Sequence, residues 1–382
     1  MTAAESVLSS APQSKVALYI DPPSHHFERD VLFTVNDPRF FNGDSVGAPY
    51  VYVRNYFEAR GIPVHTADLL PETRDGVRNV YVSFGMLDKY RRLMHRTDTS
   101  VSAFFALECP IVEPAIYREL RRAQHDFKRI FTWTDSTSLE RFVGGPLRCE
   151  RYYWPQAFDE VHEDLWSRRD RKFLCIVTNH RLPRIYFQEL YTERVRAIAF
   201  FAQYNEIDLY GPGWNEPPYR VGRTRLPYTF KRIYRAWLRQ WDRIHPDPLR
   251  VAARRVYRGV AASKSETIAQ YTFALCFENM ILRGWITEKI FDCFYSGTVP
   301  IYWGDPEVEK TIPTSCYVDM RQFSGYPELR AFLKNLTPAQ IQGYRDAARA
   351  YLKSPQARPF TKDALVDIFR RIVQEDTGVT VA

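Results

Sequence analysis

The sequence predicts an α/β protein made of two domains with parallel sheets, and three observations support this. Its 382 residues are too many for one ordinary core and suit two domains of about 150–200 residues each. Apolar residues make up 45% of the chain and aromatic residues 15%, which is enough for two packed interiors. Short apolar runs also alternate with stretches of helical periodicity, which is the pattern of βαβ units.

The first half of the chain contains five candidate strands with helices between them. A helical pattern that ends at Gly61 indicates a helix with a glycine stop. We expect strands at 15–21, 64–66, 80–84, 103–107 and 131–133, and helices at 50–60, 86–95 and 115–127.

The second half repeats the pattern after a charge-rich, apolar-poor stretch at 159–172, which we interpret as a linker. We expect strands at 173–178, 207–210, 273–277 and 299–302, and helices at 191–203, 287–296 and 362–374. The pattern predicts two Rossmann-like domains that face each other across a cleft. Their expected limits are a flexible leader at 1–14, an N-terminal domain at 15–165, a C-terminal domain at 166–355, and a helix and tail at 356–382.

Cysteine spacing and hydropathy predict a cytoplasmic protein. The chain has no run of about 20 apolar residues, and its first 15 residues lack the regions of a secretion signal. The six cysteines lie far apart and fit neither a zinc site nor a disulfide framework, so we expect thiols in a reducing compartment. They are Cys109, Cys149, Cys175, Cys276, Cys293 and Cys316.

One segment, Arg220 to Lys264, accounts for the basic character of the chain. It carries thirteen Lys or Arg and two acidic residues, a net +11, whereas the whole chain carries +8. Within it, Ile233, Trp237 and Trp241 form a helical apolar stripe. The interpretation that we favour is a helix that packs this stripe onto the second domain. The second interpretation is peripheral binding to an anionic membrane. Nucleic acid comes last and is not expected as a partner, because no known binding motif accompanies the basic residues.

The segment from 271 to 323 carries the strongest functional signal. A loop beyond the strand at 273–277 leads into a helix that Thr287 is expected to cap. Lys289 lies in the first turn of this helix, where a cation is unfavourable by about 0.3–1 kcal/mol. A bound phosphate makes the position favourable, because the ammonium and the free backbone N–H groups then point at the same anion. The adjacent Glu288 is an acceptor suited to ribose hydroxyls.

This segment resembles the donor-binding signature of the α-1,3-fucosyltransferase family, glycosyltransferase family 10. The resemblance covers about residues 207–325, and the N-terminal half is only weakly similar. It rests on Phe277-Glu278-Asn279, Thr287-Glu288-Lys289, Gly297-Thr298-Val299-Pro300, Tyr257-Arg258-Gly259 with Lys264, and Ile207-Asp208-Leu209-Tyr210-Gly211.

The resemblance implies a fold of the glycosyltransferase B type and an inverting transfer of fucose from a GDP-fucose donor to a glycan acceptor. It implies that no cofactor or metal is obligatory. It also implies that Lys289 contacts the diphosphate and Glu288 the ribose, and that Asn279 lines the donor pocket. Trp285 stands where the family usually has tyrosine. Further donor-site candidates from the motifs are Tyr210, Glu278 and Lys264.

Two roles remain, stabilisation of the leaving diphosphate and removal of the acceptor proton. Arg196 matches a helical arginine that the family aims at the phosphates, and Arg194 is the alternative. A carboxylate at a strand end of the N-terminal domain suits the base. Glu108 is the first candidate and Glu113 the second.

His180, in a loop that follows the first strand of the second domain, is a further candidate contact. Two alternative functions stay open at this point. One is a transferase that uses another nucleotide sugar, and the other is an inactive protein that binds a glycan or a membrane surface.

Overall fold

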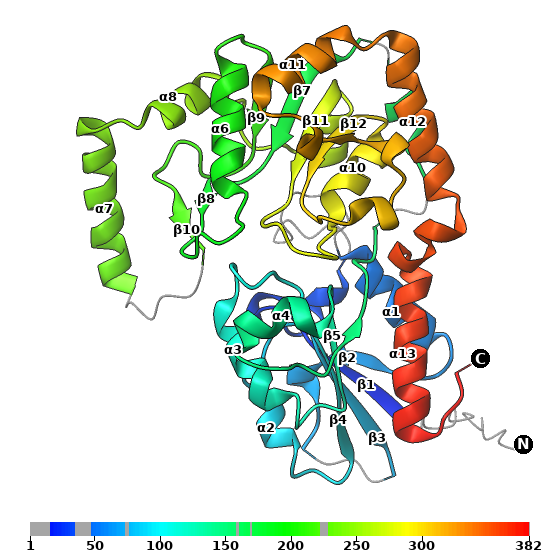
Figure 1. Ribbon diagram of the computed structural model, residues 1–382. Coiled ribbons are helices and arrows are strands. Elements are labelled where there is room, and N and C mark those ends of the chain that lie inside the picture. The colour runs from blue at the N-terminus through cyan, green and yellow to red at the C-terminus, as the bar shows by residue number, and fades with distance from the viewer. Residues whose placement is uncertain are drawn as a thin grey trace, which may run out of the picture.

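The computed structural model describes residues 16–34, 47–72, 76–157, 160–168, 170–221 and 228–381, and these form two α/β domains, one above the other in Figure 1. Each domain has its own parallel sheet with helices on both faces. The expected fold class is therefore confirmed. The expected leader at 1–14 lies outside the described residues.

The sheet of the N-terminal domain has six parallel strands in the order β2-β1-β3-β4-β5-β6. In β1, Val16, Leu18 and Ile20 face one helical layer, while Ala17 and Tyr19 face the other. Both faces are covered, which is why the strand is apolar from Val16 to Ile20. The strands are β1 (Val16–Asp21), β2 (Val64–Thr66), β3 (Arg78–Ser83), β4 (Thr99–Phe105), β5 (Arg129–Thr132) and β6 (Glu150–Arg151).

The helices of this domain come from both ends of the chain. One face of the sheet is covered by α1 (Ala48–Glu58) and by the last helix, α13 (Lys362–Thr377). The other face is covered by α2 (Tyr90–Leu93), α3 (Pro114–Ala123) and α4 (Ser136–Val143). The helix expected at 86–95 is thus confined to four residues, because Lys89 is held in a turn by ion pairs with Asp21 and Glu28.

The sheet of the C-terminal domain has five parallel strands in the order β13-β12-β11-β7-β9. One face packs against α6 (Tyr191–Ala202), α8 (Pro248–Arg255) and α11 (Tyr326–Asn335). The other packs against α9 (Lys264–Ile268), α10 (Glu288–Ser296) and α12 (Pro338–Leu352). The strands are β7 (Lys172–Val177), β9 (Ile207–Tyr210), β11 (Tyr271–Phe277), β12 (Val299–Trp303) and β13 (Val318–Asp319).

Smaller elements complete the domains. A separate parallel pair consists of β8 (Arg181–Leu182) and β10 (Tyr219–Arg220). The stretch expected as a linker contains a helix, α5 (Glu163–Trp166), because Leu165 and Trp166 bury their side chains there. Short 3-10 helices lie at His25–Phe27, Val31–Phe33, Ala67–Leu69, Val308–Lys310, Thr314–Cys316, Met320–Gln322 and Pro355–Phe360.

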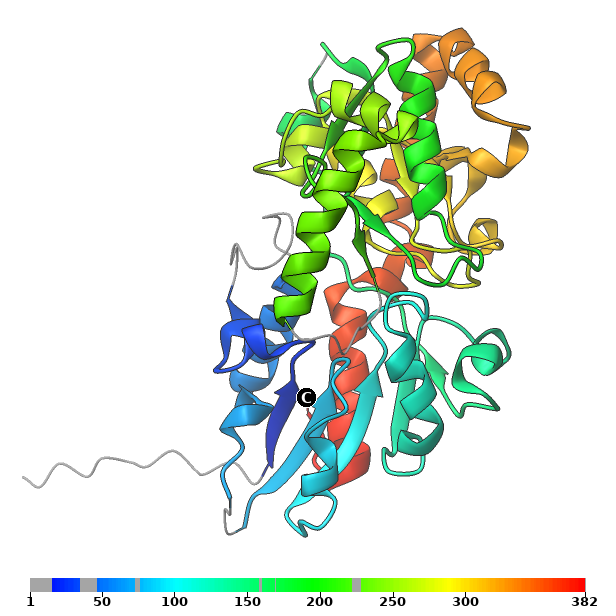
Figure 2. The same cartoon turned by 90° about the vertical axis from the view of Figure 1, so that its left-hand side faces the viewer.

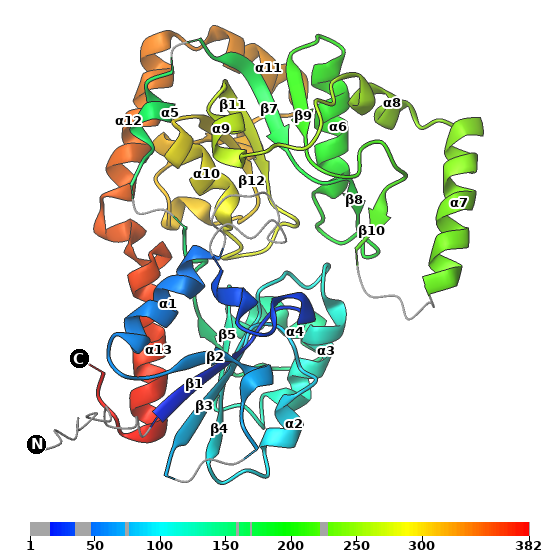
Figure 3. The same ribbon diagram turned by 180° about the vertical axis from the view of Figure 1, so that it is seen from behind.

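One helix, α7 (Tyr228–Ile244), stands away from both sheets (Figures 1 and 3), and in Figure 2 it lies in front of the two domains. The side chains of Ile233, Trp237 and Trp241 are 67%, 53% and 51% exposed. The interpretation that we favoured, in which this stripe packs onto the second domain, is therefore corrected. In the described ranges, no helix is both long enough and apolar enough to span a bilayer.

Candidate active site

A cavity of about 220 Å³ lies between the two domains. The carboxyl ends of β4, β7, β9 and β11 lead into it, which is where parallel sheets bind ligands. A larger hollow of about 660 Å³ lies beside α7, away from these strand ends. No residue of the donor-site motifs lines it. We therefore place the candidate site in the cavity between the domains. It is lined by Leu107, Glu108, Val112, Trp154, Val177, Thr178, Asn179, Arg181, Tyr191, Arg194, Gly211, Pro212, Lys264, Asn279, Trp285, Thr287, Glu288 and Lys289.

Gly211 allows the end of β9 to pass directly beside the end of β7. Its φ is +126°, and a Cβ atom there would lie 2.1 Å from the carbonyl oxygen of Thr178, so only glycine fits. Gly211 and Pro212 line the cavity, whereas the hydroxyl of Tyr210 lies 2.9 Å from that of Tyr271. The strand-end motif therefore reaches the cavity through the two residues that follow Tyr210, and Tyr210 itself does not line it.

Glu278 is buried beneath the loop that leads into α10. Its carboxylate accepts hydrogen bonds from the backbone N–H of Thr287 at 2.9 Å and from the Thr287 hydroxyl at 2.8 Å. It also accepts one from the ammonium of Lys289 at 2.9 Å. The Thr287 hydroxyl is used in this way and does not cap α10 as expected. Glu278 does not line the cavity, so its position makes it a support for Lys289 and not a ligand contact.

Gly284 and Trp285 bring the same loop against the N-terminal domain. A Cβ atom at Gly284 would lie 2.4 Å from the carbonyl oxygen of Trp133, and φ is +76° there. The ring of Trp285 packs against that of Trp133 at 4.5 Å, and Trp133 stacks on Trp154 at 4.9 Å. Trp154 and Trp285 form an aromatic wall of the cavity. The buried Nε1 of Trp285 has no hydrogen-bond partner among the described residues.

Arg194, on α6, carries a buried positive charge to the cavity. Its guanidinium donates to the carbonyl oxygen of Phe277 at 2.7 Å and to Oδ1 of Asn279 at 3.0 Å. In the part of the chain that the structure describes, no carboxylate pairs with it, and burial lowers its pKa. A buried cation held only by neutral dipoles attracts an anion. Arg196, the first candidate from the sequence, pairs with Glu193 and does not line the cavity, whereas the alternative, Arg194, does.

Three further cations, Lys264, Lys289 and Arg181, line the cavity. Lys264 pairs with Asp292 at 2.5 Å and lies 3.6 Å from the carboxylate of Glu288. Although burial opposes the charge of Lys289, its acidic neighbours raise its pKa, so the ammonium stays protonated. The lining thus combines four cations with two carboxylates, a net positive surface.

The two carboxylates of the cavity have different protonation behaviour. Glu108 lines the cavity and is exposed there, and its desolvation by the surrounding protein raises its pKa to about 7. Burial opposes the charge of Glu288 as well, but Lys289 and Lys264 outweigh it and lower the pKa to about 2. At neutral pH, Glu288 is a fixed anion, while Glu108 readily gains or loses a proton.

Glu113, the second candidate for the base, lies outside the cavity lining, at the residue before α3. Glu108 lies three residues beyond the end of β4 and lines the cavity, and the hydroxyl of Tyr117 donates to its backbone carbonyl at 2.6 Å. The structure thus brings Glu108, and not Glu113, to the other candidate residues.

His180 turns away from the cavity. Its ring stacks on Trp214 at 4.4 Å, and its Nδ1 lies 3.0 Å from the carbonyl oxygen of Glu216. Its neighbours Asn179 and Arg181 line the cavity instead, because side chains alternate along extended chain. The loop that holds His180 thus reaches the cavity through the two residues beside it. Sequence reasoning also missed Thr178, Trp154 and Tyr191, which carry no motif of their own.

Comparison with known proteins identifies the part of the chain around α8 to α12. Residues 251–346 match the family described as Glycosyltransferase family 10 (fucosyltransferase) C-term. This segment of the chain is therefore similar to the C-terminal part of family 10 fucosyltransferases. The predicted resemblance is therefore confirmed. The matched segment contains Lys264, Asn279, Trp285, Glu288 and Lys289.

Proteins with local sequence similarity to this chain include several that are fucosyltransferases by name. The Alpha-(1,3)-fucosyltransferase FucT of Helicobacter pylori is 42% identical over 74 residues, which are 19% of this chain and 16% of that protein. Human Alpha-(1,3)-fucosyltransferase 7 is 37% identical over 92 residues, 22% of this chain and 27% of that protein. The matched segments thus span about a quarter or less of these relatives. A crystal structure of an alpha1,3-fucosyltransferase aligns with 97% of this chain and 94% of its own, at 15% identity and a TM-score of 0.46.

Proposed function

We propose that this protein transfers fucose from GDP-fucose to a hydroxyl of a glycan, with inversion at the anomeric carbon. The relatives that share the family 10 domain carry fucosyltransferase names. The observation that carries the proposal is Arg194, a buried guanidinium that faces the same cavity as Glu108 and Lys289. A diphosphate satisfies such a guanidinium, since Arg binds phosphate oxygens through paired hydrogen bonds.

In this proposal the residues of the C-terminal domain hold the donor. Lys289 and Arg194 bind the diphosphate, with Lys264 behind them. Glu288 stays ionised and accepts hydrogen bonds from ribose hydroxyls. Asn279 fixes the donor pocket through its bond to Arg194. Trp285 provides an aromatic face, and its unpartnered Nε1–H supplies a donor that a ligand oxygen satisfies.

Glu108 approaches from the N-terminal domain and acts as the base in the proposed reaction. The acceptor oxygen attacks the anomeric carbon of fucose while the bond from that carbon to the diphosphate oxygen breaks. The acceptor proton passes to the ionised Glu108, and the electron pair of the broken bond leaves with GDP. One displacement of this kind inverts the anomeric centre.

We further propose that side-chain cations stabilise the leaving diphosphate and that no metal is obligatory. Charge builds on the diphosphate as the bond breaks, and preorganised cations in a confined site stabilise it. Arg181, Arg194, Lys264 and Lys289 all line the cavity. Transfer that continues undiminished in excess EDTA supports this, and restoration of lost activity by a divalent cation contradicts it.

We also propose peripheral association with an anionic membrane through the basic segment at 220–264. The support is α7, whose exposed apolar stripe has arginines beside it, a combination that suits anionic lipid. A reducing compartment such as the cytoplasm is proposed on the cysteines, all six of which are free thiols.

A thermal-shift series with GDP, UDP, ADP and CMP tests the donor, because a ligand that binds only the native state raises the melting temperature. Stabilisation by GDP alone, reduced in Lys289→Ala, is the expected result. A response to another nucleotide alone would retain the transferase and replace the donor. No response to any nucleotide, together with no turnover of GDP-fucose, would favour an inactive binding protein.

A further inference from the structure

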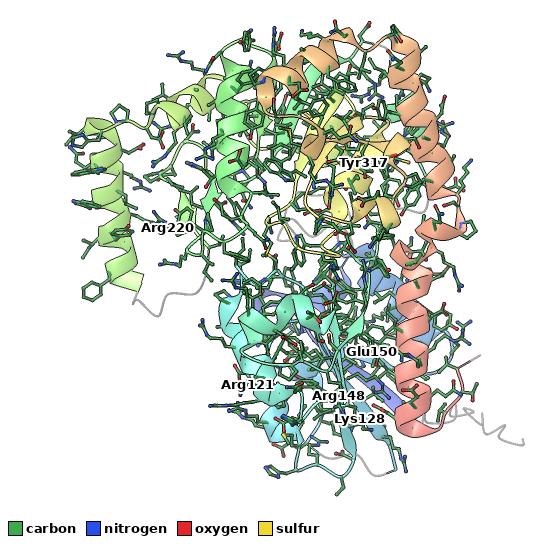
Figure 4. All side chains as sticks on the ribbon, viewed as in Figure 1. Arg121, Lys128, Arg148, Glu150, Arg220 and Tyr317 are labelled. Atoms are coloured by element: carbon green, nitrogen blue, oxygen red, sulfur yellow. The ribbon has the colours of Figure 1, made fainter. Side chains whose placement is uncertain are left out.

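The hollow beside α7 has a volume of about 660 Å³ and lies outside the candidate active site. We call it the α7 groove. One wall consists of β8, β10 and the segment before β10, and the other consists of α7 with the start of α8. Figure 4 shows Arg220, on β10, at the side of the C-terminal domain that faces α7.

The α7 groove is positively charged. Five arginines line it against two carboxylates, Glu216 and Asp242. Both carboxylates are already paired, Glu216 with Arg239 at 2.6 Å and Asp242 with Arg250 at 2.7 Å. The acidic groups of the lining are therefore neutralised within the protein.

Two arginines of the lining keep an unmatched charge. The guanidinium of Arg220 donates to the hydroxyl of Tyr186 at 2.9 Å, a neutral partner. Neither Arg184 nor Arg220 forms an ion pair with a carboxylate among the described residues. Guanidinium groups of this kind bind phosphate, sulfate or carboxylate groups of a ligand.

Aromatic rings line the same groove. Tyr234 and Trp241, on α7, are 50% and 51% exposed and both contribute to the lining. The apolar face of a pyranose ring packs on such rings, and sites for polar ligands combine aromatic surface with a few directed polar groups. Trp237 lies between them and stacks on Trp241 at 5.5 Å, but it does not line the groove.

The α7 groove and the candidate active site share a wall. Along the segment after β7, Asn179 and Arg181 line the active site, while His180 and Leu182 line the groove. The turn after β9 divides in the same way, because Gly211 lines the first cavity and Gly213 the second. A ligand in the groove thus lies behind the active site, where it can hold a chain whose end passes over the rim.

We propose that the α7 groove binds an anionic oligosaccharide, a glycan that carries phosphate, sulfate or carboxylate groups, and thereby tethers the acceptor at a distance from the reacting hydroxyl. The sugar rings pack on Tyr234 and Trp241, and the anionic groups bind Arg184 and Arg220. Only the identification of this oligosaccharide as the acceptor rests on the proposed fucosyl transfer. The binding itself is measured without donor or turnover.

The test is a titration of the full chain with a fluorescently labelled glucose hexasaccharide, in a sulfated and in a neutral form, without lipid. The double variant Arg184→Ser/Arg220→Ser is expected to bind the sulfated form at least about tenfold more weakly than wild type. The matched control, Arg232→Ser/Arg243→Ser, removes the same charge from exposed positions of α7 outside the groove and is expected to bind like wild type. Equal weakening of both variants would overturn the proposal, since it indicates unspecific attraction.

A second pair of variants tests the aromatic contacts independently of charge. Trp241→Ala is expected to weaken binding of both hexasaccharides, while Trp237→Ala leaves both unchanged. The opposite order, or no binding of the sulfated form by wild type, would overturn the proposal. Loss of binding to phosphatidylglycerol vesicles in the Arg184/Arg220 variant, with hexasaccharide binding intact, would assign the groove to lipid head groups instead.

Stabilisation by GDP separates this inference from the proposed function. The Arg184/Arg220 and Trp241 variants are expected to keep the wild-type shift in melting temperature with GDP. If the groove proposal is wrong, hexasaccharide binding is missing and the GDP shift remains. If the proposed function is wrong, the GDP shift is missing and hexasaccharide binding remains.

Discussion

Arg194 and Arg196 lie two positions apart on α6, a rotation of about 200° on a helix, and so occupy opposite faces. We predict that Arg194→Gln weakens GDP binding by about 10- to 100-fold, because a charged hydrogen-bond donor to the diphosphate is lost. Isothermal titration with GDP measures this. Arg196→Gln removes the same charge from the exposed face and serves as the control. Equal GDP affinity in the two variants would contradict the assignment, provided that both keep the wild-type melting temperature without ligand.

The sequence held a signal for Arg194 that motif matching missed. Tyr191, Arg194, Val195 and Ile198 follow the helical spacing of the buried stripe, so an arginine at this position had to point inward. No comparable signal existed for His180. In an extended loop, successive side chains point to opposite sides, and no local pattern indicates which of the two alternating sets faces the ligand.

Glu108 predicts a pH dependence of transfer. Because its pKa is raised to about 7, the ionised base is lost below that pH, and kcat/KM should fall by about tenfold per pH unit on the acid side. Glu108→Gln should lower kcat by about 10²–10⁴-fold and remove this limb, while GDP binding is spared. A pH–rate profile with GDP-fucose provides the measurement. An unchanged acid limb in the variant would assign the ionisation to another group.

The raised pKa of Glu108 also makes the stability of the folded protein depend on pH. A carboxyl with a raised pKa binds its proton more tightly in the folded state, so its contribution is full below its ordinary pKa of 4.5 and is lost as pH rises through 7. Glu108→Gln should therefore melt at a higher temperature than wild type above pH 7, with little difference at pH 4.

At the scale of elements, the loop between β11 and α10 depends on close contact with the other domain. Gly284→Ala places a Cβ atom 2.4 Å from the carbonyl oxygen of Trp133 in a left-handed conformation. We predict a loss of about 1–3 kcal/mol of stability and weaker GDP binding, because the loop must shift from Trp133 and carries Trp285 with it. Chemical denaturation and GDP titration measure the two effects.

Gly343→Ala is the control for that substitution. Gly343 is exposed within α12, and an added Cβ meets nothing within 4 Å. Replacing glycine by alanine in such a helix should stabilise it by about 0.5–1 kcal/mol. A similar gain in Gly284→Ala would show that the contact with Trp133 does not constrain the loop.

Local sequence patterns predicted an element well where contacts between residues close in sequence determine it. The strands at 64–66 and 207–210 were predicted to the residue. The helix expected at 86–95 was not, since Lys89 is fixed by Asp21 and Glu28, which are distant in sequence. For α7, amphipathicity was evident, but the surface that its apolar stripe faces depends on tertiary structure, and the stripe is exposed.

At the scale of the whole molecule, the first and last elements that the structure describes, β1 and α13, belong to the same domain. After the C-terminal domain the chain returns as α13, which packs on the sheet formed by the first residues (Figure 1). Phe369 is fully buried there, with its ring 5.9 Å from that of Phe105 and 6.4 Å from that of Phe57. The N-terminal domain therefore cannot complete its core until the rest of the chain has been made.

This arrangement separates the two halves of the proposed reaction. Glu108 belongs to the N-terminal domain, whereas Arg194 and Lys289 belong to the other. We predict that Phe369→Ala costs about 3–5 kcal/mol and lowers the melting temperature, because it leaves a cavity under α13. On warming, fucosyl transfer should be lost at a lower temperature than GDP binding, since the domain that carries the base is weakened first.

Parallel measurements of transfer and GDP binding against temperature test this order. Arg370→Ala is the matched control, because Arg370 neighbours Phe369 on α13 but is only half-buried and lies outside the core, so it should change neither curve. Simultaneous loss of transfer and GDP binding in Phe369→Ala would mean that the two domains unfold as one unit. In that case the contact between Trp133 and Trp285, and not α13 alone, couples the N-terminal sheet to the donor site.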